Sequence, residues 1–170
     1  MLAIRIVKIA LVAAVAFFAT LVAFGNVTDY WTNFAFVQHV LSMDTIFPHS
    51  TITYRAITSP LLHHLAYCII IATETLIAVL CWTGAVMLLR RLSANAATFN
   101  AGKIFAVLGL ALAFLLWQVG FMSIGGEWFG MWQSKEWNGV ESAFRFVAVA
   151  GVVLLLVVMP DGELARPRRR

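Results

Sequence analysis

Residues 59–82 read SPLLHHLAYCIIIATETLIAVLCW and carry a carboxylate, Glu74, near the middle of an apolar run. The run continues to residue 89, and about 20 apolar residues are enough to cross the hydrocarbon core of a bilayer as a helix. A polar group at that depth must find a partner in the protein, because lipid offers none. The stretch therefore predicts a membrane-spanning helix that packs against other helices.

Composition extends this prediction to the whole chain. Of its 170 residues, 62% are hydrophobic and 12% are charged, whereas soluble domains carry about 25% charged residues. Three further runs are long and apolar enough to span a bilayer. We therefore expect an all-α integral membrane fold in which residues 1–170 form a single four-helix bundle. The expected spans are 6–25, 60–89, 103–124 and 139–159.

The first of these runs also has features of a signal peptide. Arg5 and Lys8 precede it, and residues 23–25, AFG, are similar to a small-residue cleavage site. However, the apolar stretch is longer than the roughly 7–15 residues of a signal core. We therefore expect it to remain as a membrane span.

Charged residues are distributed unevenly between the two predicted sides of the membrane. Cations flank the spans on one side and crowd the end of the sequence: Arg5, Lys8, Arg90, Arg91, Lys103, Arg166, Arg168, Arg169 and Arg170. The connections on the other side are richer in acids: Asp29, Asp44, Glu127 and Glu136, against Arg55 and Lys135. The positive-inside rule then predicts that the amino and carboxyl termini are both cytoplasmic. Since topology signals account for the net charge of +4, we expect no nucleic-acid partner.

The two connections on the side opposite the termini are rich in aromatic residues. Residues 26–58 contain apolar residues at helical spacing, which predicts a short interfacial helix at 33–43 in the first periplasmic loop, ended by Pro48. We expect the tryptophans on this side to form an interfacial aromatic belt: Trp31, Trp128, Trp132 and Trp137. The alternative is a platform on which a sugar or a cofactor stacks.

Polar residues of three predicted spans fall at similar depth. At roughly 100° per residue, His63, Tyr67 and Glu74 lie along one stripe of the second span. The expected intramembrane cluster comprises Glu74, Gln118, Arg145, Glu141 and Tyr67. In it, Glu74 is ionised and paired with Arg145, and Gln118 completes the hydrogen bonds. Such a cluster either fixes which helix faces which or forms a proton, ion or quinone site.

All four histidines lie between residues 39 and 64, on the predicted outer side. His39, His49, His63 and His64 are candidate ligands for zinc or copper, although their spacing matches no compact motif. A haem held by His63 or His64 together with Met122 is a further hypothesis, because His/Met ligation is known. No motif identifies a cofactor, so quinone, haem and metal all stay open.

Three stretches resemble a known family: GNVTDYWTNFAFVQHVLSMDTIFP at 25–48, residues 55–67 from RAIT to HHLAY, and EWFGMWQSKEWNG at 127–139. They resemble the bacterial family of predicted small integral membrane proteins called domain of unknown function 2165. The resemblance extends over nearly the whole chain and implies a four-span protein of the bacterial inner membrane. It implies no activity, cofactor or catalytic residue. Because these stretches lie in the outer loops and outer halves of spans, it also implies that any site faces the periplasm.

The third predicted span carries small residues at steps of three and four, which lets another helix approach closely: Gly102, Ala106, Gly109 and Ala113. This stripe and the lack of a catalytic motif favour a non-catalytic accessory or scaffolding subunit of a larger membrane complex, and not an enzyme on its own. The expected partners are the lipid bilayer and other membrane subunits, or further copies of the chain. Two alternatives stay open. One is a periplasm-facing quinone-, haem- or metal-binding protein in redox chemistry, and the other is a small-ion or solute transporter that depends on Glu74.

Overall fold

The computed structural model describes residues 2–164, and this part of the chain is helical and contains no strand. The tail arginines that contributed to the charge prediction, Arg166, Arg168, Arg169 and Arg170, lie outside the described residues. Four helices within the described part are long and apolar enough to cross a membrane: Leu2–Thr28, Pro60–Arg90, Ala96–Trp128 and Val140–Val158. The predicted fold class, an all-α bundle with four spanning helices, is confirmed.

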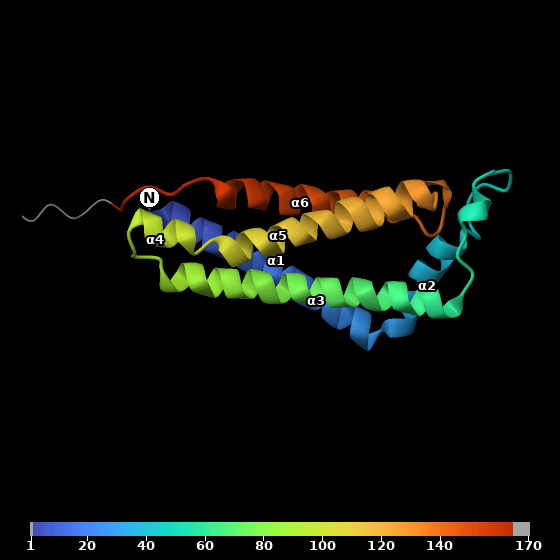
Figure 1. Cartoon of the computed structure of the whole chain (residues 1–170), viewed down its shortest axis with the longest axis horizontal. Coiled ribbons are helices and arrows are strands. Elements are labelled where there is room, and N and C mark those ends of the chain that lie inside the picture. Colours follow the sequence, from blue (N-terminus) through green and yellow to red (C-terminus); the bar gives the residue numbers. More distant parts are fainter. Residues whose placement is uncertain (1, 165–170) are drawn as a thin grey trace, which may run out of the picture.

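Figure 1 shows the order of the elements along the bundle. The α-helices are α1 (Leu2–Thr28), α2 (Tyr30–Ser42), α3 (Pro60–Arg90), α4 (Ala96–Ala101), α5 (Ile104–Leu115) and α6 (Val140–Val158). A π-helix of 13 residues, η2 (Leu116–Trp128), continues α5. Two short 3-10 helices, η1 (Thr53–Arg55) and η3 (Met131–Gln133), lie in the connections.

Backbone features explain where the helices around α2 begin and end. Asp29 alone separates α1 from α2, and its φ of −118° and ψ of 53° turn the chain. α2 ends at Met43, which adopts the left-handed conformation with a φ of 53° and donates its N–H to the carbonyl of Val40. Pro60 begins α3 at the first helical position, where a missing N–H costs no hydrogen bond. The helix predicted at 33–43 corresponds to α2. It starts earlier, at Tyr30, because only Asp29 separates it from α1.

α3 is the central helix of the bundle, and both α1 and α5 pack along it. Small residues bring α5 close to α3. A Cβ added to Gly109 would lie 2.6 Å from Sγ of Cys81, and one added to Gly84 would lie 2.7 Å from Cβ of Ala106. The small-residue stripe of α5 is therefore used within the chain, against α3. This internal packing accounts for the stripe, so the stripe no longer favours a role as an accessory subunit.

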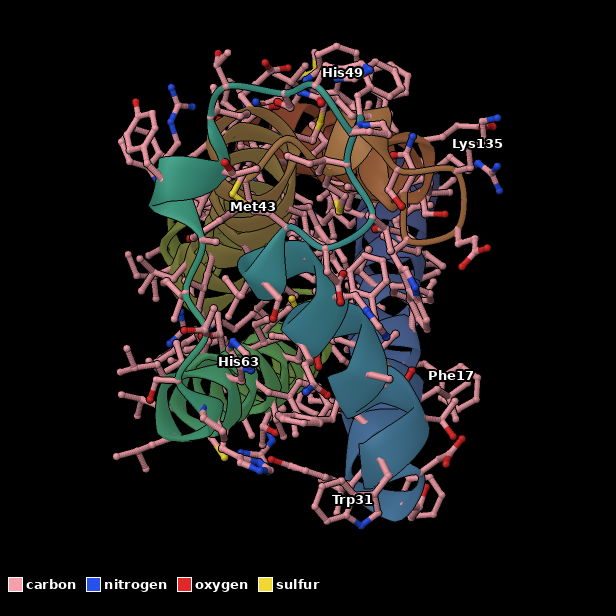
Figure 2. All side chains as sticks on the ribbon, turned by 90° about the vertical axis from the view of Figure 1, so that its right-hand side faces the viewer. Phe17, Trp31, Met43, His49, His63 and Lys135 are labelled. Atoms are coloured by element: carbon pink, nitrogen blue, oxygen red, sulfur yellow. The ribbon has the colours of Figure 1, made fainter. Side chains whose placement is uncertain are left out.

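The two ends of the bundle are formed by different segments of the chain (Figure 1). The basic end holds the start of α1, the turn between α3 and α4, and residues 159–164. The loop end holds α2 and the connections 43–59 and 129–139. Figure 2 looks onto the loop end and shows α2 crossing it, from Trp31 at the rim towards Met43. A helix and two loops thus cover this end of the bundle.

Candidate functional site

Two adjoining cavities lie among α1, α3, α6 and η2, with volumes of about 340 Å³ and about 280 Å³. The residues that line both are Phe18, Val22, Glu74, Trp117 and Phe146. The two spaces are therefore lobes of one cavity that meet at Glu74. The apolar lobe extends from there between Leu11 of α1 and Val153 of α6. The polar lobe extends towards the loop end and adds Asn26, Asn33 and Tyr67 to the lining.

Glu74 is held at this junction by a single hydrogen bond. Its side chain is 3% exposed, and Oε2 accepts a bond of 2.7 Å from Nδ2 of Asn26. Among the described residues, Oε1 has no hydrogen-bond partner and no cation pairs with the carboxylate. Tyr67 secures the last turn of α1 beside it, because its hydroxyl donates to the carbonyl oxygen of Asn26 over 3.1 Å. One carboxylate oxygen is thus left for a group that enters the cavity.

The pair predicted between Glu74 and Arg145 does not form. Nη2 of Arg145 instead donates to Oε1 of Glu141 over 2.7 Å, one turn away on the same helix, and both side chains are largely exposed. The reason is rotational. Ala143 and Val147 mark the buried face of α6, and Arg145 lies midway between them, on the opposite face. Arg145 lines the apolar lobe but makes no ion pair with Glu74.

Gln118 also departs from its predicted role. It lies on η2, where its carbonyl oxygen accepts a hydrogen bond of 3.0 Å from Oγ of Ser123, and it is absent from the lining of both lobes. The π-helix accounts for this, since its wider turn changes which side chains point inward. Trp117 and Phe121 face the cavity in its place.

A row of aromatic rings forms one wall of the cavity. The ring of Phe146 lies 4.9 Å from that of Phe18 and 4.5 Å from that of Trp117, and Trp117 lies 4.5 Å from Phe121. These rings come from α1, α6 and η2, so the row ties together the helices that surround the cavity. Rings at such distances contribute packing energy beyond their buried area.

Three of the four candidate histidine ligands are hydrogen-bonded to other groups of the protein. His39 donates from Nδ1 to the carboxylate of Asp44 over 2.8 Å, and His63 donates from Nε2 to the carbonyl of Ile57 over 2.7 Å. Nδ1 of His64 is hydrogen-bonded to the hydroxyl of Tyr30, whereas His49 is exposed. Within residues 2–164, no three His, Cys, Asp or Glu side chains are grouped so that they could hold a metal ion. Met122 lies on η2 and lines neither lobe.

All the tryptophans of the expected belt lie at the loop end, but their settings differ. Trp31, Trp128 and Trp132 are largely exposed, and the guanidinium of Arg55 lies over the ring of Trp128 at 4.5 Å. Trp137 is partly buried and stacks on His39 with the ring centroids 4.5 Å apart. Trp31, Trp128 and Trp132 thus have the exposure expected of an interfacial belt, whereas Trp137 takes part in internal packing.

A second buried polar group, the basic-end network, was not foreseen from the sequence. It consists of four buried side chains: Arg5, Lys8, Lys103 and Asp161. Oδ2 of Asp161 accepts from Nζ of Lys8 over 2.8 Å and from Nζ of Lys103 over 2.6 Å. Both lysines also donate to the carbonyl of Met159. The network thereby fastens the chain after α6 to α1 and to the start of α5.

Arg5 extends this network to the turn between α3 and α4. Nη1 donates to the carbonyls of Leu92 and Ala94, and Nη2 donates to the carbonyl of Gly162. The guanidinium also lies over the ring of Phe99 at 4.4 Å, while its Nε is buried without a partner in the described part of the chain. Lysines and arginines near a span end could have signalled this arrangement, because a buried cation requires an acceptor.

The electrostatics of Asp161 follow from these contacts. Burial alone would raise the pKa of its carboxyl group, but the hydrogen bonds from Lys103 and Lys8 and their positive charges outweigh burial. They hold the pKa of Asp161 below its ordinary value. The carboxylate form is therefore the stable form in the folded protein.

Four apolar helices packed around a partly polar interior define a small integral membrane protein. The family of predicted small integral membrane proteins called DUF2165 matches residues 4–160, and the chain belongs to that family. No curated protein and no solved structure matches the chain.

Proposed function

We propose that the protein binds a small amphipathic molecule from the membrane in the cavity that centres on Glu74. The observation that carries this proposal is the position of the carboxylate. It is almost completely buried, it lies where the two lobes meet, and Oε1 has no partner among the described residues. Ionisable groups inside membrane bundles are candidates for function for this reason.

Size and lining support the proposal. Ligand sites are concave, mostly apolar and about 300–1,000 Å³ in volume, with a few polar groups that orient the ligand. The apolar lobe, of about 340 Å³, accommodates an aliphatic or aromatic body. The polar lobe offers Glu74, Asn26 and Asn33 to a head group. Such a molecule would lie along the bundle, with its polar part towards the loop end.

Access from the bilayer is also built into the structure. α1 packs mainly on α3 and makes far fewer contacts with α6. Phe18 of α1 and Val149 of α6 line the apolar lobe and yet are 39% and 56% exposed. The lobe is therefore open to the lipid side between these two helices, and a molecule dissolved in the membrane reaches it without crossing the loop end.

We infer that the membrane is the bacterial inner membrane and that the basic end is cytoplasmic. The family supports a membrane location. The orientation is supported, by the positive-inside rule, by the cations near this end: Arg5, Lys8, Arg90, Arg91 and Lys103. In this orientation the polar lobe lies on the periplasmic side of the cavity. Substituted-cysteine labelling of Lys135 and Arg90 positions from either side of the membrane tests the orientation.

The binding proposal is tested by filling the cavity. Val22 lines both lobes, whereas its neighbour Leu21 is 53% exposed on the same helix. We expect native mass spectrometry of the purified protein to reveal a bound small molecule. Val22→Trp should lose it and Leu21→Trp should keep it. The proposal fails if no small molecule is bound, or if Val22→Trp retains as much of it as the wild type.

The same purification tests the accessory role expected from the sequence. A stoichiometric partner protein that survives mild detergent would support that role, and a lone, homogeneous chain would contradict it. The two functions are compatible, because a ligand-binding subunit can belong to a larger complex. The structure adds no further support for the accessory role, since the stripe that favoured it packs against α3.

A further inference from the structure

The free hydrogen-bonding groups of the polar lobe include more acceptors than donors, and they restrict the chemistry of the head group. Nδ2 of Asn26 donates to Glu74, and Nδ2 of Asn33 donates to the carbonyl of Asp29 over 3.1 Å. A carbonyl oxygen can only accept, so the amide of Asn33 must be oriented with its nitrogen on Asp29 and its own oxygen free. Each asparagine thus uses one of the two hydrogens of its amino group within the protein.

The hydroxyl of Tyr67 is committed as well, because its proton is donated to the carbonyl of Asn26. The polar groups that remain for a ligand are Oε1 of Glu74, the amide oxygens of Asn26 and Asn33, and one N–H of each of these amides. The three oxygens are all acceptors when Glu74 is ionised, which is the form that a cationic ligand stabilises. A donor head group would satisfy the three oxygens, whereas a head group that presents only acceptors, such as a quinone carbonyl or a carboxylate, would leave Oε1 of an ionised Glu74 without a partner.

The charges around Glu74 determine which kind of donor head group is favoured. Glu74 has no cationic partner within residues 2–164. The other charged residue of the lining is Arg145, whose charge is compensated by its ion pair with Glu141. Asp29, exposed at the junction of α1 and α2, adds negative potential near the polar lobe. The balance around Glu74 is therefore negative.

Aromatic rings complete a site for a cation. Trp117, Phe146 and Phe18 line both lobes beside Glu74, and Phe121 and Phe36 line the polar lobe. The faces of such rings attract ammonium groups within about 6 Å, and the attraction is larger where water is excluded. A carboxylate together with aromatic faces is the combination that recognises an organic cation.

From this combination we infer that the bound molecule is a lipophilic amine. Its protonated nitrogen donates to Glu74 and to the two asparagine oxygens, and its apolar body occupies the apolar lobe. This inference rests on the proposed function, because it names the class of ligand for the same cavity. It adds that Glu74 selects the ligand by charge.

The test uses three photoreactive probes that differ only in the head group. Each has the same alkyl chain with a diazirine, and the heads are a primary ammonium, a methyl ketone and a carboxylate. The protein is held in a neutral detergent, irradiated with each probe and digested, and labelled peptides of α1, η2 and α6 are quantified. For each probe, labelling in Val22→Trp is subtracted, and Leu21→Trp serves as the matched control.

We expect the ammonium probe to label the cavity at least about tenfold more strongly than the ketone or the carboxylate probe, as one charge-assisted hydrogen bond accounts for such a factor. Glu74→Gln should remove this preference, and Glu74→Asp, which keeps the charge, should retain most of it. Size-exclusion chromatography of each variant checks that it is folded.

The possible outcomes separate the two proposals. If the ketone or the carboxylate probe labels the cavity as strongly as the ammonium probe, the inference about the amine is overturned and the binding proposal stands. The same holds if Glu74→Gln keeps the preference. If no probe gives labelling that Val22→Trp abolishes, both proposals fail.

Discussion

The basic-end network and the cavity around Glu74 are two buried polar regions of one bundle, and they are built differently. At the basic end, Asp161 accepts from two lysines, and each lysine also donates to a backbone carbonyl. In the cavity, Glu74 accepts one hydrogen bond from a neutral amide, and it borders open space on both sides. One carboxylate is surrounded by its partners, and the other is left incomplete.

This is the difference that we expect between a buried charge that stabilises the fold and one that binds a ligand. A charge that is buried for stability requires partners, because desolvation otherwise costs several kcal/mol, on the order of the whole stability of a small protein. A charge that binds a ligand must keep part of its hydrogen-bonding capacity free until the ligand arrives. The two carboxylates are thus expected to respond in opposite ways to the same substitution.

The largest effect is expected from Asp161→Asn. Removing this negative charge leaves Lys8 and Lys103 buried beside each other without compensation. Breaking a buried ion pair on one side costs about 3–5 kcal/mol. We expect a loss of that size in the free energy of unfolding, measured by reversible denaturation in mixed micelles.

Glu163→Gln is the matched control for this substitution. Glu163 lies two residues further on, is exposed, and accepts the N–H of Ala96 over 3.1 Å, which a glutamine oxygen can also do. Its loss of charge should change stability by less than about 1 kcal/mol. Equal effects of the two substitutions would show that the basic-end network does not hold the bundle together.

A smaller effect is expected from alanine at two glycines, one in the tightly packed part of the bundle and one outside it. At Gly84, a Cβ would lie 2.7 Å from Cβ of Ala106, so α5 must shift, and such overpacking costs about 1–3 kcal/mol. At Gly25, near the end of α1, a Cβ meets nothing within 4 Å. There alanine should stabilise the helix by up to about 1 kcal/mol.

Thermal unfolding of both glycine variants in the same detergent measures these opposite signs. If Gly84→Ala were as stable as the wild type, the close approach of α3 and α5 would not be required for the fold. If Gly25→Ala were destabilising, the last turns of α1 would be more crowded than the structure shows.

The spans could be predicted because the bilayer fixes their length and polarity. Long apolar runs bounded by charges leave few alternatives to helices. The π-helix η2 could not be predicted in the same way. A span that is apolar on every side, such as 103–124, has no contrast between faces from which a wider helical turn could be recognised.

The hydrogen-bond partner of Glu74 could not be predicted from the sequence for a related reason. The sequence gives the depth of a residue by counting along a helix, but the direction of its side chain depends on how that helix is rotated in the bundle. Arg145 has a suitable depth and the wrong direction. Asn26, the partner in the structure, lies just beyond the apolar run, where the sequence indicates a connection rather than a span.

Acid should weaken the basic-end network selectively. A carboxyl group whose pKa is lowered by folding stabilises the protein above its unfolded-state pKa, which is about 3.9 for aspartate, and this contribution is lost as the pH falls through the lower folded-state pKa. We expect the difference in stability between the wild type and Asp161→Asn to be constant from about pH 7 to 5. It should shrink below about pH 4.

Thermal unfolding of the two proteins across this pH range measures the difference directly. Because both proteins contain every other carboxylate, effects of those groups cancel. A difference that already shrinks between about pH 7 and 5 would mean that the pKa of Asp161 is not lowered by its lysines.

The smallest loss of stability is expected from a substitution of Glu74 itself. Glu74→Gln is the same change from carboxylate to amide as Asp161→Asn, but it leaves no buried cation without a partner, and the amide oxygen can still accept from Asn26. We expect the free energy of unfolding to fall by less than about 1 kcal/mol, or to rise, because the substitution removes the cost of burying an unpaired carboxylate. A loss similar to that of Asp161→Asn would instead make Glu74 a structural group. A small loss in stability, together with a large loss in the ammonium labelling, would show that this carboxylate is kept for binding rather than for folding.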